Sequence, residues 1–361
     1  MAAPSWGKSM AVAALAALLG SGIPAAARAA EAQSEAKSTV RLSIVGGLAA
    51  VTQFTRFEKP FWEQEITARS NGRIVATIRP FDGGGLRGQE MLQLLRLGVV
   101  PFGNVLLSLV SADEPELDAP DLPLVNPDFE RLRQTVGLYR QHMRDILRDR
   151  YGIVLLGVYV YPAQVLYCED AFAGLDDLAG RKVRTSAVGQ SDLMGALGAL
   201  PVIVPFADIV PAVKSNVADC AITGTLSGYE IGLGNVTSHL HGMAITWGLS
   251  FFGANMAAFD SLPADIQGVI RDGVADLEAR IWKQAEVDTE RGIACNTGSD
   301  ACIDLEKGTM TLVNAPADEV RRAALLRDVV LARWVDRCGQ ACVSAWNDHL
   351  AAATGVPARA N

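Results

Sequence analysis

Apolar and polar positions follow two periodicities along the chain, which predicts strands and helices in alternation. Short runs rich in Val, Ile and Leu have the character of strands, and longer segments repeat their apolar positions with the period of a helix. Strands are predicted at residues 40–45, 73–79, 103–110, 153–161, 182–184, 249–259 and 309–313. Helices are predicted at residues 53–70, 88–97, 191–200, 264–291 and 319–349, with a further long helix ending near residue 150. Such alternation is typical of open α/β sheets.

The length of the chain favours two lobes. The chain has 361 residues, and one hydrophobic core seldom organises more than about 250–300 residues. Pro162, directly after the apolar run 153–161, marks the first expected crossing between lobes. We expect lobe I to comprise 39–162 plus 250–292, and lobe II to comprise 163–249 plus 293–361, including a disulfide-bearing C-terminal segment.

Residues 1–30 have the layout of a signal peptide. One cation, Lys8, precedes the apolar run Met10–Leu19, and small residues follow as far as Ala30. A transmembrane anchor needs about 20 apolar residues, and this run is shorter and is broken between Gly20 and Pro24. No later run is long and apolar enough to span a bilayer. We therefore predict a periplasmic protein that is not embedded in the membrane.

Net charge excludes one class of partner. The formal charge is −8, and it becomes −10 once Lys8 and Arg28 leave with residues 1–30, which contain no Asp or Glu. A strongly acidic surface argues against nucleic acid. An anionic ligand stays possible, because a local arginine outweighs distant charges that salt screens.

An even number of cysteines, six, fits an oxidising compartment. They are Cys168, Cys220, Cys295, Cys302, Cys338 and Cys342. The preferred pairing closes the 295–302 and 338–342 loops locally, with crossed bridges between these loops left open, and the first two cysteines can pair across neighbouring strands. The spacings fit neither zinc ligands nor a C-x-x-C redox site. We predict no metal and no cofactor.

Arg184 is the strongest candidate for ligand chemistry. It ends the β-type run 182–184 and leads through Ser186 and Gly189 into a helical pattern. An arginine at a strand exit facing a helix N-terminus presents a rigid fork of donors to a carboxylate. The alternative is a surface arginine paired with Asp176 or Asp177.

The sequence that follows carries a family resemblance. The strand Gly180–Arg184, the turn Gly198–Pro201 with Pro205, and the helix Asp208–Asp219 occur in the order and spacing of one family. This segment resembles the second lobe of TRAP-type (tripartite ATP-independent periplasmic) solute-binding proteins, the dicarboxylate-binding receptors. The resemblance extends more weakly over about residues 40–350.

The resemblance implies a two-lobed periplasmic binding protein of type II-like α/β fold, with a ligand cleft between the lobes and long C-terminal helices. It implies a receptor, not an enzyme, that captures a small organic acid and delivers it to the TRAP membrane permease. The family arginine that clamps the ligand carboxylate corresponds to Arg184.

Departures from sialic-acid-type members of the family suggest the kind of ligand. Their second carboxylate-binding arginine falls on Gln164, their ligand-binding asparagine falls on Thr223, and an apolar residue near Leu109 replaces a further arginine. An unpaired second carboxylate would be costly to bury. We therefore expect a monocarboxylate with an apolar or aromatic body.

Further contacts are expected at the crossing and from the opposite lobe. Trp247, followed by Phe251 or Phe252, is the candidate aromatic contact, with a core position as its alternative. The candidates from the opposite lobe are Gln53 and either Ser108 or Ser111.

Two other functions remain as alternatives. The segment 189–193 half-matches the nucleophile elbow of hydrolases with Ser191 as nucleophile, although Leu193 occupies the place of the final glycine. The hydroxyl of Ser191 fits a helix cap better. The second alternative is a ligand-sensing receptor for a signalling partner, with the same fold and pocket.

Overall fold

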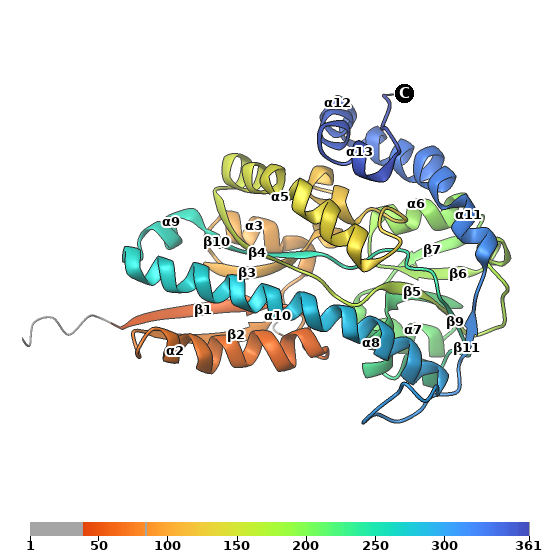
Figure 1. The fold of residues 1–361 in the computed structure, drawn as a ribbon, viewed down its shortest axis with the longest axis horizontal. Helices are drawn as coiled ribbons and strands as arrows, with labels where there is room; N and C mark the ends of the chain where they lie inside the picture. The colour runs from red at the N-terminus through yellow and green to blue at the C-terminus, as the bar shows by residue number, and fades with distance from the viewer. Residues whose placement is uncertain (1–38, 84, 361) are drawn as a thin grey trace, which may run out of the picture. The chain divides into compact units, whose positions relative to one another are not determined.

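The computed structural model describes residues 39–83 and 85–360. Within this part of the chain two mixed β-sheets are each covered by helices (Figure 1). The predicted signal peptide, residues 1–30, lies outside the described residues.

The first sheet has five strands in the order β2-β1-β3-β10-β4. These are β1 (Val40–Gly46), β2 (Ile74–Pro80), β3 (Phe102–Leu106), β4 (Ile153–Tyr159) and β10 (Ser250–Asn255). β1 pairs in parallel with β2 and β3, whereas β10 pairs antiparallel with β3 and β4. β10 therefore enters the sheet from a distant part of the sequence.

The second sheet has six strands in the order β11-β9-β5-β8-β6-β7. These are β5 (Gln164–Cys168), β6 (Lys182–Thr185), β7 (Leu200–Ile203), β8 (Cys220–Gly224), β9 (His239–His241) and β11 (Thr311–Val313). β6 is parallel to both β7 and β8, and β5 is antiparallel to β8.

Helices occupy most of the remaining chain. They are η1 (Gln53–Glu58), η2 (Phe61–Glu65), α2 (Ile66–Arg69), η3 (Gly88–Glu90), α3 (Met91–Arg96), α4 (Leu107–Val110), η4 (Pro115–Asp121), α5 (Phe129–Tyr151), η5 (Leu175–Leu178), α6 (Val188–Ala196), η6 (Phe206–Asp208), α7 (Ile209–Lys214), α8 (Thr225–Glu230), η7 (Leu233–Asn235), α9 (Met256–Asp260), α10 (Ala264–Thr297), α11 (Pro316–Leu325), η8 (Leu326–Leu331), α12 (Ala332–His349) and α13 (Ala351–Thr354). None of the helices in the described ranges combines the length and the apolar character that crossing a bilayer requires.

The helix α10 contacts elements of both sheets. It packs against β4 and α2 beside the first sheet and against α8 and β11 beside the second (Figure 1). A Cβ atom at Gly292 would lie 2.2 Å from the backbone nitrogen of Leu226. Glycine at this position therefore permits the close approach of α10 and α8.

The passage between α4 and α5 is buried although its sequence is acidic and rich in proline. Asp118 and Asp121 are both 3% exposed. The Asp121 carboxylate accepts the backbone N–H groups of Trp247 and Leu249 at 2.7 and 2.8 Å. Those N–H groups lie just before β10, so a buried carboxylate fixes the chain as it enters the first sheet. Burial raises the pKa of Asp121 to about 7.

Several predicted elements begin or end at other residues. The strand expected at 249–259 ends at Asn255 and is followed by the helix α9. The strand expected at 103–110 stops at Leu106 and continues as the helical turn α4, which contains Ser108. The helix expected at 191–200 begins at Val188, so Ser191 lies inside α6 and is not its cap. Its hydroxyl donates instead to the carbonyl of Ala187 at 3.1 Å.

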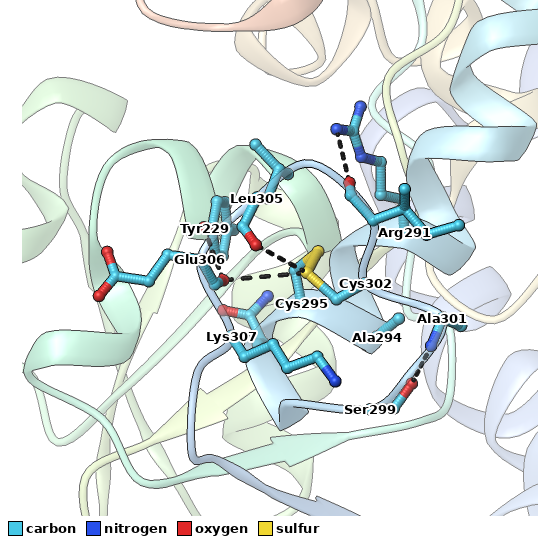
Figure 2. The surroundings of a disulfide bond; sticks show 12 residues. Tyr229, Arg291, Ala294, Cys295, Ser299, Ala301, Cys302, Leu305, Glu306 and Lys307 are labelled. Carbon is cyan, nitrogen blue, oxygen red and sulfur yellow. Dashed lines mark hydrogen bonds between the residues drawn. A yellow bond between two sulfur atoms is a disulfide. The ribbon is translucent and has the colours of Figure 1, made fainter.

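Three disulfides occur in the described residues. Cys168–Cys220 joins β5 to β8 at directly opposed positions, and Cys338–Cys342 lies within α12. Cys295–Cys302 closes the loop after α10 (Figure 2). Tyr229 of α8 donates its hydroxyl to the carbonyl of Glu306 in the same loop at 2.8 Å. This bond ties the disulfide loop to α8.

Candidate functional site

A cavity of about 720 Å³ lies where the parallel strands of both sheets end. β1, β2 and β3 present their carboxyl ends to it, and so do β6, β7 and β8. The carboxyl ends of strands in open α/β sheets are the usual position of ligand sites, and the volume is that of a small-molecule pocket. The cavity therefore has one wall from each sheet.

Each wall has its own residues. The first wall comprises Leu48, Phe81, Asp82, Leu86, Arg87, Gly88, Gln89, Glu90, Leu106 and Leu109. The second comprises Gln164, Arg184, Ser186, Ile203, Val204, Pro205, Phe206, Ala207, Asp208 and Thr223.

Arg184 is the buried cation of the second wall, 3% exposed. Its Nε donates to the carbonyl of Val204 at 2.8 Å, and its Nη1 donates to the carbonyl of Ile222 at 2.7 Å. Within residues 39–83 and 85–360, no carboxylate lies at ion-pair distance from it. The alternative partners Asp176 and Asp177 are engaged elsewhere, by Arg321 and by the N–H of Ala173.

Desolvation dominates the electrostatics of Arg184. Burial lowers the pKa of its guanidinium to about 9, because water is removed and neutral carbonyls replace it. The group is still protonated at neutral pH. A buried cation that lacks a charged partner costs folding free energy, and such groups in cavities are candidate ligand sites.

Gln164 and Thr223 lie beside Arg184 in the same wall. Gln164 begins β5 and Thr223 is near the end of β8, two antiparallel strands whose register brings these ends together. The Gln164 Oε1 accepts bonds from Gln190 Nε2 and from Thr246 Oγ1, both at 2.9 Å. These bonds fix the amide, and its orientation is therefore set before any ligand arrives.

Three other predicted contacts lie outside this lining. Trp247 is 4% exposed, donates its Nε1 to the carbonyl of Asn126 at 2.9 Å and packs edge-on against Phe129. Gln53 borders a separate cavity of about 20 Å³, where its Nε2 donates to Glu58 at 2.7 Å. Ser108 borders another cavity, of about 10 Å³, which Thr246 and Gly248 also line. Trp247 therefore lies in the core, which is the alternative predicted for it from the sequence.

Two aromatic side chains of the cavity were not predicted from the sequence. Phe81 and Phe206 line the cavity, and each directly follows or closely follows a strand, β2 and β7. Ligands bind beyond the carboxyl ends of strands. The position of both phenylalanines after a strand therefore could have identified them as candidate ligand contacts. Phe251 and Phe252 are instead completely buried within β10.

The arrangement suits binding of an anion with an apolar remainder. Arg184 supplies N–H donors at one end, and the hydroxyl of Thr223 and the amide of Gln164 stand next to it. Leucine, isoleucine, valine, proline, phenylalanine and alanine account for ten of the twenty lining residues, five on each wall. A carboxylate would therefore meet Arg184 while an apolar body contacts the rest.

Comparison with known proteins gives a family and a fold. The model of the family described as bacterial extracellular solute-binding protein, family 7, matches residues 51–296. The structure of DctP7, a Bordetella pertussis extracytoplasmic solute receptor binding pyroglutamic acid, has a TM-score of 0.74 and 21% identity, covering 86% of this chain and 99% of that chain.

Two further structures are similar. A TRAP periplasmic solute-binding protein from Desulfovibrio salexigens with bound orotic acid has a TM-score of 0.72 and 16% identity, covering 87% of this chain and 99% of that one. Another, from Desulfovibrio desulfuricans with bound sn-glycerol-3-phosphate, has a TM-score of 0.74 and 14% identity, covering 89% and 99%. The predicted two-lobed α/β fold class is confirmed.

Proposed function

The chain belongs to family 7 of the bacterial extracellular solute-binding proteins, and on that premise we propose that it captures an organic monocarboxylate through Arg184 for a TRAP-type transporter. The resemblance to TRAP solute-binding proteins that the sequence indicates is confirmed by the family match. Members of this family are receptors, not enzymes, which removes the hydrolase alternative based on Ser191.

The observation that carries the proposal is the buried guanidinium at the cavity. Two N–H groups of Arg184 are fixed by the carbonyls of Val204 and Ile222, so its orientation is set by the fold. A ligand carboxylate would supply the anion that the described residues do not. The affinity comes from restoring a charge partner at a site where water is already displaced.

The remaining lining supports a ligand with one carboxylate and an apolar body. Arg87, the other arginine of the lining, is exposed and lies 3.8 Å from Glu90. An exposed, paired cation contributes little to holding a second buried carboxylate. Phe81 and Phe206 replace Trp247 as the candidate aromatic contacts.

The ligands of similar structures are anions, and most of them carry a carboxylate. Pyroglutamate, orotate and galacturonate each have one carboxylate, malonate has two, and sn-glycerol-3-phosphate has a phosphate instead. An arginine in a cavity serves each of these anions. Small organic acids are therefore the first ligands to test.

The two walls of the cavity suggest how the receptor captures its ligand and delivers it. We take 39–162 plus 250–292 as lobe I and 163–249 plus 293–361 as lobe II, with one cavity wall on each. A ligand held on Arg184 in lobe II gains the contacts of lobe I only when the lobes close. Closure is then a shift of population driven by these additional contacts. The closed receptor docks on the TRAP permease in the periplasm, where residues 1–30 direct it as a signal peptide.

Two measurements on the purified protein test the proposal. Denaturing mass spectrometry identifies an acid that copurifies, and thermal shift is measured with a panel of mono- and dicarboxylates. At about a hundred times its dissociation constant, a ligand adds about 2.7 kcal/mol of apparent stability. We expect a monocarboxylate to give the largest shift. A panel in which no carboxylate raises the melting temperature, or only dicarboxylates do, contradicts the proposal.

A further inference from the structure

Asp82 brings a second charge into the cavity, from the wall opposite Arg184. It lies two residues beyond the end of β2, next to Phe81, and belongs to the first sheet's side of the lining. Arg184 belongs to the second sheet's side. A ligand that bridges the two walls therefore has a cation at one side and a carboxylate at the other.

The carboxylate of Asp82 is fixed in place. Its Oδ1 accepts the backbone N–H of Ala49 at 3.0 Å, which links the loop after β2 to the loop after β1. The side chain is half-buried, and this desolvation raises its pKa above the usual value for an aspartate. No Lys, Arg or His within the described ranges forms an ion pair with it. It is a positioned acceptor with capacity left for a ligand.

The other charged residues of the lining are on the solvent side. Arg87, Glu90 and Asp208 are all exposed, and Arg87 lies closest to Glu90. Charges in contact with water are screened and weakly felt inside the cavity. Asp82 and Arg184 are the lining charges that are withdrawn from solvent.

A simple carboxylic acid satisfies only half of this pair. Its carboxylate would neutralise Arg184 and leave Asp82 as an uncompensated anion in a cavity that loses water on closure, which is costly. A dicarboxylate would bring a second negative group toward Asp82. An acid with an N–H donor, either an ammonium or a lactam or amide N–H, would satisfy both residues.

On the basis of the proposed function, we propose that Asp82 is a specificity-determining residue that selects nitrogen-bearing acids, by accepting an N–H from the ligand whose carboxylate is held on Arg184. The receptor's substrates are then amino acids and related cyclic amides, in preference to nitrogen-free acids of the same size. A hydrogen bond to a charged group contributes about 1.5–3 kcal/mol, or roughly 10- to 150-fold in affinity.

Matched pairs of acids test this inference by calorimetric titration. L-Proline and L-pyroglutamate are compared with cyclopentanecarboxylate, and 4-aminobutanoate is compared with pentanoate, so that the donor varies at two distances from the carboxylate. Each acid is titrated into the wild type, Asp82→Asn and Glu63→Gln. Asp82→Asn keeps an oxygen acceptor for Ala49 and removes the charge, and Glu63→Gln removes an exposed carboxylate of η2 that does not line the cavity.

We expect the tightest acid for the wild type to carry an N–H and to bind at least tenfold more tightly than its nitrogen-free partner. Asp82→Asn should reduce that preference about tenfold or more for an ammonium donor while changing the affinity for the nitrogen-free partner less than threefold. Glu63→Gln should retain the wild-type preference. Equal melting temperatures of the ligand-free proteins verify that the loop is intact.

The inference fails if the tightest acid carries no N–H, or if Asp82→Asn weakens both members of a pair equally. These results leave the proposed function standing, because carboxylates still bind. If none of the five acids nor any acid of the wider panel binds the wild type, the proposed function itself fails. The two failures are therefore distinct.

Discussion

Glu58, in the helical segment η1, and Arg184, in β6 of the second sheet, are both buried charged side chains, but their surroundings differ in kind. Glu58 is 0% exposed, and its carboxylate accepts three N–H groups, from Gly47, Gln53 and Asn104, at 2.7–3.0 Å. Arg184 meets two neutral carbonyls and a cavity.

The two side chains also differ in how burial shifts their pKa. Burial raises the pKa of Glu58 to about 7, although its three hydrogen bonds oppose the shift. Glu58 can therefore become neutral near physiological pH. Arg184, with a pKa of about 9, stays charged at that pH. The protein completes the surroundings of Glu58 from its own residues, whereas Arg184 requires an anion from outside. The comparison separates a structural buried charge from a ligand-binding one.

Removing Glu58 should have the largest effect on folding. Glu58→Ala leaves three buried donors without an acceptor, each costing about 1–3 kcal/mol, so we expect a loss of about 3–9 kcal/mol in the free energy of unfolding. Urea denaturation of the ligand-free protein measures it. Glu63→Ala, at an exposed position of the neighbouring helical segment η2, should change stability by less than about 0.5 kcal/mol. Equal effects of the two substitutions would refute the structural role.

The pH dependence of stability should also depend on Glu58. Its folded pKa of about 7 exceeds the reference value of 4.5, so the folded state binds more protons between these values, and stability falls as pH rises from 4.5 to 7. The expected contribution is about 3 kcal/mol. Glu58→Gln cannot titrate and should lack this contribution. Denaturation curves at pH 4.5, 6 and 7.5 that fall in parallel for both proteins would contradict the assignment.

Replacing Arg184 should affect ligand binding and leave folding almost unchanged. Arg184→Met removes an uncompensated buried charge, so the ligand-free protein should keep its free energy of unfolding within about 1 kcal/mol or gain stability. With a ligand at a hundred times the wild-type dissociation constant, the wild type gains about 2.7 kcal/mol and the variant gains nearly none. Chemical denaturation with and without ligand measures both. A large loss of stability without ligand, together with a normal gain on adding it, would place Arg184 in the same class as Glu58.

Trp247 should give the smallest effect on binding. Its indole packs among core residues and its Nε1–H bonds to Asn126, so Trp247→Phe should cost about 1–2 kcal/mol of stability and leave the dissociation constant within about twofold. Titration of the folded variant provides the check. A tenfold loss of affinity would restore Trp247 as a ligand contact.

The sequence predicted the elements around Arg184 better than it predicted the opposite wall. A strand exit, a turn and a helix follow one another within residues 180–219, so local pattern and family motif together were sufficient. Asp82 and Phe206 come together only through the meeting of two sheets. Long-range contacts of that kind leave no local periodicity.

Burial of polar sequence was the harder feature to predict. The acidic passage with Asp118 and Asp121 has the composition of a surface loop, yet Asp121 is buried because it accepts N–H groups that lie 126 and 128 residues away. For Trp247, aromatic character next to a crossing fits both a ligand contact and a core position. Only the direction of the side chain distinguishes them, and composition does not encode it.

The most direct test of the account is calorimetric titration of Arg184→Ala against Arg181→Ala with the acid that binds the wild type most tightly. Arg181 also donates to two backbone carbonyls, those of Asp170 and Ala171, but it is partly exposed and outside the cavity. We predict a loss of about 2–5 kcal/mol, roughly 30- to several-thousand-fold in affinity, for Arg184→Ala, and less than twofold for Arg181→Ala. Equal affinity of Arg184→Ala and wild type for the same acid would contradict the account.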